Sequence, residues 1–574
     1  SEIENIGRRL PSVADRDGEY YLRQEGNGLL IGAYEKDVRF WAEDGTPQGF
    51  GHELFADDLE RIMDNVMRAM DRVPVAADAG IKRVINGPMI WSPDSSALFG
   101  PVPELKNYFC CCGIIPGFSQ SGGLGLMSAQ WIIDGEPEYD MFPWDLARYG
   151  NWANKAFTKE RVRDQYGNRF KIHMPYEERD AGRPLKTRPV YQKQKELGCV
   201  FGLNYGWEHP LWFAPEGVEP KEDYGFKRQD WWHHVKTECD NLRTNVGIVD
   251  VSNFGKYEVK GEGASDWIDK IIANNVPKEI GRSCLTPLIG IRGGVAGDFT
   301  VTKLNDEHFF IVGSGMAERY HIRFFEMIDR PNTVSFQSLT EEMCGFNVAG
   351  PKSRTLLSRM TQEDLSNENW KFMRSRSITI AGIDAIAIRV SFTGDLGWEI
   401  YVKTENQVKL YEALLETGAD LGVKPVGGRS LLSLRVEKGY GSWGREYSPE
   451  YWPQEVGLDR LIKLDKPSFL GKEAYLKIKD QKPREKLVVL EVTADRNADP
   501  AGGEPVFLRD GTPVGRVTSG AYGYTCDKSL AICMIKTDHA IDGNEFHVAV
   551  IGQNHDAVML KEAPFDPLGS KLRG

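Results

Sequence analysis

Several features that the sequence lacks limit the classes of protein to which this chain can belong. The nine cysteines form no CxxC pair, and no histidines stand at zinc-finger spacing, which argues against a structural metal; no metal site is expected. An odd set without a pairing framework fits a reducing compartment. There is no apolar run of about 18 residues, and the first residues lack the apolar core of a signal peptide. We therefore expect no membrane association and a cytoplasmic location, or the mitochondrial matrix in a eukaryote.

An excess of positive charge is also lacking. The chain has 71 Lys and Arg residues against 83 Asp and Glu residues, which gives a net charge of −12. Such a chain is unsuited to broad contact with nucleic-acid phosphates, so no nucleic acid is expected and a small-molecule ligand is favoured. Its 574 residues exceed the about 250–300 residues at which single cores stop growing. Several domains are therefore expected.

The pattern of apolar residues changes along the chain. Residues 20–35 predict a hairpin around Gly-Asn-Gly, and residues 52–73 predict an amphipathic helix. The apolar run NYFCCCGII predicts a strand, followed by the glycine-rich turn PGFSQSGGLG and the start of a helix. Residues 151–232 are read as a connector and residues 233–482 as alternating strands and helices, followed by a small antiparallel barrel over 483–574. The apolar stripe of the predicted helix comprises Leu54, Leu59, Ile62, Val66 and Met70.

The most distinctive local motif is IRGGVAGDFTVTKL, in which glycines precede Asp298. Glycine permits a tight backbone at this point, so a carboxylate is expected where the strand FTVTKL begins. The alternative is a turn aspartate that caps a hairpin, and the local residues alone favour that alternative. The surrounding motifs must decide between a structural and a catalytic role.

Two further motifs supply candidate ligands. In RVSFTGDLGWEIYV, Glu399 follows Phe392 by seven residues. A carboxylate can accept two hydrogen bonds from the amino-pyrimidinone edge of a pterin while an aromatic ring covers its face; the alternative is an exposed strand glutamate beside a core phenylalanine. In RSLLSLRVEKGYGSWGREYSPE, Arg435 lies on a predicted helix, where it could bind an anionic glutamyl tail, brace a carboxylate or lie on the surface.

Three other features are assigned structural roles. Gly439, Gly441 and Gly444 spell G-x-G-x-x-G but follow a helix rather than a strand, so a dinucleotide site is rejected. The Cys110–Cys112 run and the histidines of QDWWHHVKTE are read as packing residues. No Ser-His-Asp or Cys-His arrangement can be singled out.

Taken in order, VGIVDVSNFGKYEVKG, GGVAGD, SFTGDLGWE and LRVEKGY, followed by GTPVGRVTSGAY, resemble the aminomethyltransferase (glycine-cleavage T-protein) family from about residue 235 onward. The resemblance implies that Asp298 is the catalytic acid beside folate N5, that Phe392 and Glu399 bind the pterin, and that Arg435 is the arginine of the site. This sequence departs from the family at Phe392, where a tyrosine is usual, and at Asp395, where a glutamate is usual.

The first 230 residues resemble the dimethylglycine/sarcosine dehydrogenase flavoproteins through RQEGNGLLIGAYE, INGPMIWSPDSSALFGPV, PGFSQSGGLG, AGRPLKTRPVY and GWEHPLWFAPEGVEP. The implied fold is α+β and multidomain. It comprises an incomplete flavoprotein substrate domain over 1–150, the connector, a folate-binding domain over 233–482 and the barrel. The resemblance places Gly122, Gly123 and Gly125 near the flavin. The family's nucleotide-binding half with G-x-G-x-x-G is not found, so FAD binding requires that half from a separate FAD-binding subunit, unless the chain is a fragment or the flavin function is lost.

The function implied is flavin-dependent oxidation of an N-methyl amine such as dimethylglycine or sarcosine, coupled to transfer of the one-carbon unit to tetrahydrofolate. The product is methylene-tetrahydrofolate. Two alternatives remain open at this point: a folate methyltransferase for another donor such as a sulfonium compound, and a non-catalytic regulatory relative. A homo-oligomer is a further possibility that the sequence leaves open.

Overall fold

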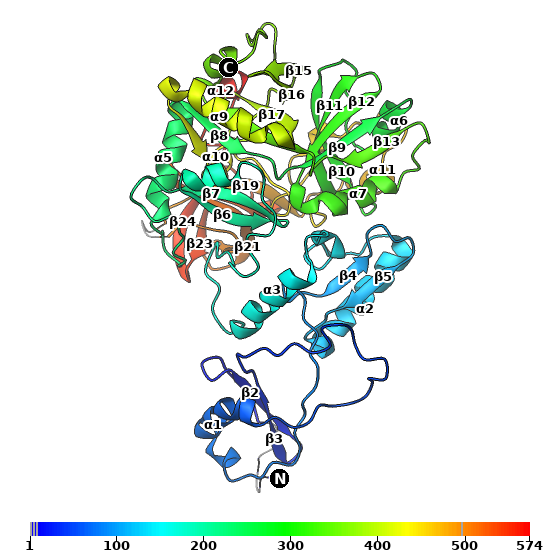
Figure 1. Ribbon diagram of the computed structural model, residues 1–574, viewed down its shortest axis with the longest axis vertical. Helices are drawn as coiled ribbons and strands as arrows, with labels where there is room; N and C mark the ends of the chain where they lie inside the picture. The colour runs from blue at the N-terminus through cyan, green and yellow to red at the C-terminus, as the bar shows by residue number, and fades with distance from the viewer. Residues whose placement is uncertain (1–2, 4–5, 7–9, 495–497) are drawn as a thin grey trace.

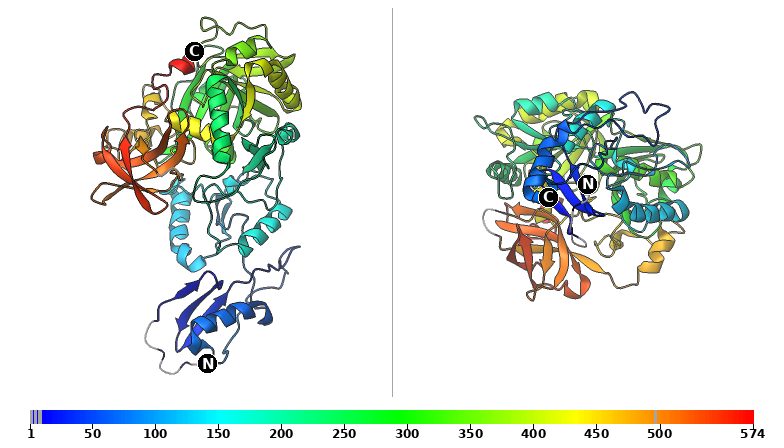
Figure 2. Two further views of the ribbon diagram at one scale, coloured as in Figure 1. Left: turned by 90° about the vertical axis from the view of Figure 1, so that its left-hand side faces the viewer. Right: turned by 90° about the horizontal axis from the view of Figure 1, so that it is seen from below.

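The computed structural model describes residue 3, residue 6 and residues 10–494 and 498–574. Within them the chain forms an elongated molecule, with a small sheet at the N-terminal end and a large body that carries the C-terminus (Figure 1). A closed barrel lies beside that body (Figure 2). No helix in the described part of the chain is long and apolar enough to cross a membrane.

The N-terminal end is a three-stranded antiparallel sheet with one helix against it. The hairpin predicted over residues 20–35 is confirmed, since Tyr20 pairs with Ala33 and Glu25 with Gly28. The predicted helix over 52–73 begins too early: residues 52–59 are not helical, and Leu54 is exposed. The elements are β1 (Val13–Asp15), β2 (Tyr20–Glu25), β3 (Gly28–Ala33) and α1 (Met63–Arg72).

A second unit links this end to the body. Its hairpin packs on a helix through Phe99, Leu124 and Trp131. The segment expected to be a connector also contains two helices and a hairpin. The elements of this part are β4 (Leu98–Pro101), β5 (Phe109–Cys112), α2 (Gly117–Asp134), α3 (Lys155–Gly167), α4 (Tyr191–Glu196), β6 (Cys199–Asn204) and β7 (Trp207–Phe213).

The body contains two sheets that face each other. The first has the order β10-β11-β12-β9-β13, and the second β15-β16-β17-β14-β8-β18. The first comprises β9 (Gly255–Lys260), β10 (Ser283–Ile289), β11 (Val295–Asn305), β12 (His308–Gly313) and β13 (Ser335–Ser338). The second comprises β8 (Val246–Asp250), β14 (Met343–Ala349), β15 (Ser375–Ile380), β16 (Ile383–Ile388), β17 (Gly397–Lys403) and β18 (Val423–Val426).

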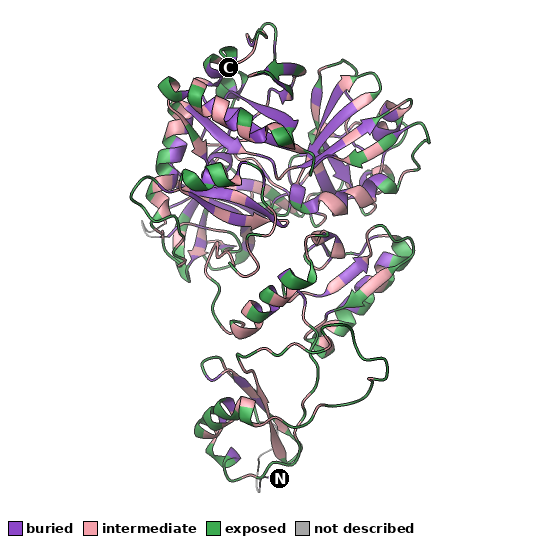
Figure 3. Ribbon diagram, viewed as in Figure 1, coloured by how far each residue is buried: buried purple, intermediate pink, exposed green. Residues whose placement is uncertain are grey.

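Strand alternation divides the side chains between an outer and an inner core. On β12, Phe309 and Ile311 join the outer core, which includes residues of α6 (Ala264–Asp269) and α7 (Glu318–Glu326). Phe310 and Val312 instead join the inner core between the sheets. Burial is therefore concentrated in the body, as Figure 3 shows. The remaining helices are α5 (Trp231–Thr244), α8 (Ser353–Ser358), α9 (Gln407–Thr417), α10 (Gly428–Glu437), α11 (Lys472–Ile478) and α12 (Ser570–Arg573).

The predicted C-terminal barrel is confirmed. Six strands close in the order β19-β22-β21-β20-β23-β24, and closure leaves no open sheet edge. The barrel packs on the body through α10, which contacts β21 and β22. Its strands are β19 (Glu485–Val492), β20 (Pro505–Phe507), β21 (Pro513–Gly523), β22 (Lys528–Lys536), β23 (Glu545–Val550) and β24 (Gln553–Met559).

Candidate functional site

Asp298 lies on β11, just after an irregularity in the strand. Leu288 pairs with Gly297 but Ile289 pairs with Val295, so Ala296 is the extra residue of a bulge. A bulge bends the strand and changes the direction in which the next side chains point. The strand begins at Val295, three residues before Asp298, so the carboxylate lies inside the strand rather than at its first residue.

The environment of Asp298 makes it a candidate proton acceptor. Its side chain is half-buried, and burial raises the pKa of this carboxyl from 3.8 to about 6. Tyr447 lies close by: burial and, second, the charge of Asp298 raise the pKa of that phenol. A carboxylate whose pKa lies just below neutral pH can take up a proton during a reaction and release it afterwards.

Glu399 is buried on β17. Its Oε2 accepts a hydrogen bond of 2.7 Å from the Tyr401 hydroxyl, and burial raises the pKa of Glu399 from 4.5 to about 7. Across the ladder Glu399 pairs with Asn347, whose Oδ1 accepts from the Ser391 hydroxyl at 3.1 Å. The predicted alternative of an exposed strand glutamate is therefore wrong.

Strand alternation places Asp298 and Glu399 on the sheet faces that enclose the inner core. Phe299 and Val301 belong to the outer core, so alternation places Asp298 and Thr300 on the inner face of β11. Thr300 pairs with Val312 on β12. Neighbouring Phe310 contacts Tyr401, with ring centroids 5.2 Å apart, and Tyr401 bonds to Glu399. Both carboxyls thus face the inner core.

Phe392 lies on the turn that precedes β17. Its half-buried ring stacks against Tyr440 with centroids 5.9 Å apart and planes 22° apart. The same turn carries Asp395, which forms an ion pair with Arg243 of α5. Two parallel aromatic planes that remain partly open are suited to contact with a planar ring.

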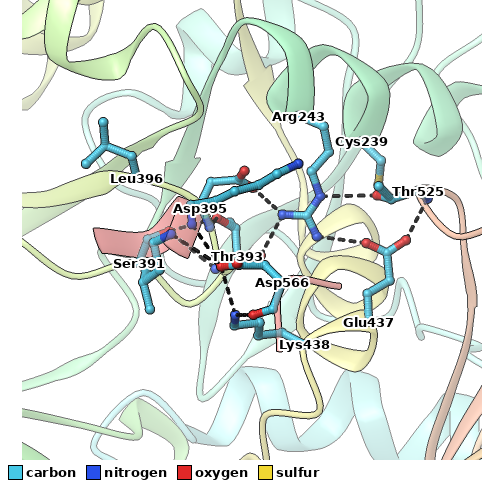
Figure 4. A network of polar contacts seen from close by, with 12 residues as sticks. Cys239, Arg243, Ser391, Thr393, Asp395, Leu396, Glu437, Lys438, Thr525 and Asp566 are labelled. Carbon is cyan, nitrogen blue, oxygen red and sulfur yellow. Dashed lines mark hydrogen bonds and ion pairs between the residues drawn. The ribbon is translucent and has the colours of Figure 1, made fainter. Parts of the chain in front are cut away.

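Arg243 connects four separate segments, as Figure 4 shows. Besides Asp395, its guanidinium donates to the Thr393 carbonyl at 2.8 Å and to Glu437 at 2.7 Å. Glu437 in turn accepts from the Thr525 backbone N–H. The network therefore fixes the turn that holds Phe392 against α5, α10 and the barrel.

Arg435 is buried on α10 and is occupied by protein groups. It donates to Glu446 at 3.0 Å, to the Tyr440 carbonyl at 2.8 Å and to the Ser519 hydroxyl at 2.6 Å. Glu446 also accepts from the Ser519 hydroxyl and from the Ser442 backbone N–H. Of the roles considered for Arg435, this geometry favours bracing a carboxylate over binding a ligand, and it excludes a surface position.

Gly122, Gly123 and Gly125 lie inside α2, which begins at Gly117. The expected turn with free backbone N–H groups is therefore wrong, because these residues follow the first helical turn. All three are exposed, and apart from the adjoining helix itself no part of the protein lies within 4 Å of the place where a Cβ would stand on any of them. They form an open glycine surface on the helix.

Sequence reasoning missed Tyr401, Tyr440 and Arg243. Tyr401 carries a signal, since a residue two positions after Glu399 on a strand faces the same side. Tyr440 and Arg243 become neighbours of the site only through tertiary contacts. Within the described ranges, no group of three or more His, Cys, Asp or Glu residues could hold a metal ion.

Comparison with family models divides the chain into four matches. Residues 2–131 match the FAD dependent oxidoreductase model and 134–187 its central domain model. Residues 190–466 match the GCVT N-terminal domain, and 485–566 match the glycine cleavage T-protein C-terminal barrel domain. The expected order of an oxidoreductase region, a T-protein region and a barrel is confirmed; the finer limits at 150, 232 and 482 stay predictions.

Three curated relatives align over nearly the whole chain. Human mitochondrial dimethylglycine dehydrogenase is 35% identical over 98% of this chain and 66% of its own length. The formaldehyde-forming 4-methylaminobutanoate oxidase of Paenarthrobacter nicotinovorans is 32% identical over 100% and 70%. Human mitochondrial sarcosine dehydrogenase is 30% identical over 100% and 67%. The chain thus spans about two thirds of the length of these relatives.

A solved structure supports the fold of the body and barrel. The glycine cleavage system aminomethyltransferase T of Bartonella henselae aligns with a TM-score of 0.58 and 22% identity. The alignment covers 67% of this chain and 99% of that one. At this identity the likeness concerns the fold alone.

Proposed function

Since this chain belongs to the dimethylglycine/sarcosine dehydrogenase family, we propose that it acts in the oxidative demethylation of an N-methyl amine and in transfer of the one-carbon unit to tetrahydrofolate. The names of these relatives share one chemical theme, an N-methyl group on an amino acid. The proposed substrate is therefore a carboxylate-bearing N-methyl amine of the dimethylglycine or sarcosine type. The proposed product is methylene-tetrahydrofolate.

The observation that carries the proposal is that the half-buried Asp298 and the buried Glu399 both lie on sheet faces toward the inner core. Glu399 has two carboxylate oxygens, and the described contacts occupy Oε2 with Tyr401. Such a group is suited to the paired N–H donors of the pterin edge. Phe392, stacked on Tyr440, is suited to cover a ring face. The residues present thus fit a bound folate.

Asp298 is proposed as the catalytic carboxylate. With a pKa of about 6, it is ionised at neutral pH and can hold the proton released at folate N5 or stabilise positive charge on the one-carbon unit. A positioned base of this kind contributes about 10² to 10⁴ in rate. Arg435 is proposed to fix α10 and the barrel through Glu446 rather than to contact the folate.

FAD, when bound, would supply the acceptor for hydride from the N-methyl amine. The open glycine surface of α2 permits close approach of another group, because no side chain covers it. Several apolar side chains of the N-terminal part are also exposed, as expected of a surface that meets a partner. These exposed side chains include Ile81, Ile85, Met89, Ile90 and Phe118. The proposed partner is a separate FAD-binding subunit or a second copy of this chain. For a eukaryotic cell, the matrix is the proposed location.

The experiment supplies the natural protein with FAD, tetrahydrofolate, an electron acceptor and one candidate donor at a time. Dimethylglycine, sarcosine and 4-methylaminobutanoate are compared with a sulfonium donor, and folate products are identified by mass spectrometry. The proposal expects methylene-tetrahydrofolate from an N-methyl amine. Methyltetrahydrofolate formed from the sulfonium compound, with no turnover of any amine, would overturn it.

A further inference from the structure

The C-terminal end of α2 is hydrogen-bonded to the turn formed by residues 290–294, which leads into the strand that carries Asp298. Glu136, two residues beyond the helix, is buried. Its Oε2 accepts a hydrogen bond of 3.1 Å from the Arg292 backbone N–H, and its carbonyl accepts one of 2.7 Å from Arg292 Nε. Arg292 Nη2 also donates to Asp134 at 2.9 Å. Three bonds thus join the two segments.

The fit is close on both sides of this contact. A Cβ on Gly290 would lie 2.7 and 2.8 Å from the two Glu136 carboxylate oxygens, and a Cβ on Gly135 would lie 2.9 Å from Ile291 Cδ1. All three distances are shorter than ordinary van der Waals contact. Glycine at 290 and 135 is therefore what lets the turn and the helix end meet.

The turn 290–294 leads directly into β11, so its position sets where that strand begins. Gly290 and Gly294 close it through a backbone hydrogen bond of 2.9 Å. Val295 follows, and its N–H donates to the Tyr451 carbonyl at 3.0 Å. The bulge at Ala296 then sets the direction of Asp298. Only three residues separate Gly294 from Asp298, so a displacement of the turn is passed along the backbone to the carboxylate.

We propose that Glu136 is a positioning residue that holds the turn 290–294 and thereby fixes Asp298 in the folate site. This inference rests on the proposed function. The helix α2, which ends two residues before Glu136, carries the open glycine surface nearer its other end. An 18-residue helix is about 27 Å long, so α2 is a rigid element that ties the oxidoreductase part of the chain to the folate site.

The test measures affinity for 5-methyltetrahydrofolate by calorimetric titration of the chain. Glu136→Ala removes the acceptor, and about tenfold weaker binding is expected from the lost backbone bond. Glu136→Gln keeps an acceptor oxygen and nearly the same volume, so binding within about twofold of the unchanged chain is expected. Glu138→Ala is the matched control, because Glu138 is an exposed glutamate on the same segment.

A double-mutant cycle separates positioning from general loss of structure. If Glu136 acts through Asp298, Glu136→Ala weakens binding in the unchanged background but has less than about a twofold effect in the Asp298→Asn background. Full additivity would overturn the positioning role. Should Glu136→Ala fail to fold, Gly290→Ala tests the contact from the turn, with about tenfold weaker binding expected and unchanged binding contradicting the proposal.

Two kinds of failure are distinguishable. An unchanged chain that binds no folate would overturn the proposed function and this inference with it. A chain that binds folate, together with a folded Glu136→Ala variant that binds equally well, would overturn the positioning role alone.

Discussion

Replacing Glu399 with glutamine is expected to stabilise the protein while weakening its ligand site. Burial raises the pKa of this carboxyl from 4.5 to about 7. Above pH 7 both the folded and the unfolded protein carry the charge, but the folded protein does so at a cost. The difference between the two pKa values corresponds to a loss of about 3 kcal/mol of folding free energy in the wild type. The glutamine variant carries no charge at this position and therefore avoids that loss.

The sign of the pH dependence follows from the direction of the shift. Below pH 4.5 the carboxyl is protonated in both states, so its ionisation contributes no difference between variant and wild type. As the pH rises toward 7, the unfolded chain ionises first and the wild type loses stability relative to the variant. The gain in the Glu399→Gln variant is therefore small near pH 5 and greatest at pH 8.

The assay is urea unfolding at pH 5 and pH 8, with Glu368→Gln as the control at an exposed position. Folate affinity is measured on the same samples. Glutamine presents an amide donor where the pterin edge also donates, so affinity is expected to fall about tenfold to a hundredfold. A stability gain that is equal at both pH values, or unchanged folate affinity, would refute the reasoning.

Three further substitutions test other parts of the site. Phe392→Tyr is expected to strengthen folate binding up to about tenfold in a titration, because the added hydroxyl supplies one more hydrogen bond; weaker binding would contradict this. Arg435→Met leaves Glu446 buried and unpaired, which is expected to cost about 3–5 kcal/mol in denaturant unfolding, and Glu446→Leu should restore most of that loss. Arg243→Met is expected to destabilise the chain by a similar amount and to weaken folate binding, because the turn at Asp395 loses its anchor; unchanged affinity would show that this turn does not support the site.

Local patterns predicted the elements that depend on neighbouring residues. The hairpin of β2 and β3 follows from alternating apolar residues around Gly26 and Asn27. The barrel follows from short strands separated by turns such as Asp510-Gly511. In both cases the sequence pattern and the final contacts lie close together along the chain, so little tertiary information is needed.

Packing overrode local propensity in α2. Three glycines favoured a turn, and each costs a helix about 1 kcal/mol relative to alanine. Leu124, Met127 and Trp131 nevertheless stand at three- and four-residue spacing and form a buried cluster with Phe99. The free energy of burying that stripe outweighs the glycine penalty, and the helix continues through the predicted turn.

The geometry around Asp298 depended on contacts far apart in sequence. Phe310 meets Tyr401 across two sheets, and Glu136 meets the turn at Gly290 from another region of the chain. No local pattern encodes such contacts. The motifs could nominate Asp298 and Glu399, but only the arrangement of the two sheets directs both side chains toward the inner core.

The central claim is that Asp298 promotes transfer of a one-carbon unit to tetrahydrofolate. The most direct measurement follows the ¹³C-labelled N-methyl carbon of dimethylglycine into methylene-tetrahydrofolate, comparing the natural protein with its Asp298→Asn variant at saturating folate. The account predicts that the variant still binds folate, with about tenfold lower affinity than the wild type, whereas transfer of the label at saturating folate slows by about 10² to 10⁴. Transfer at the wild-type rate in the folate-bound variant would contradict it.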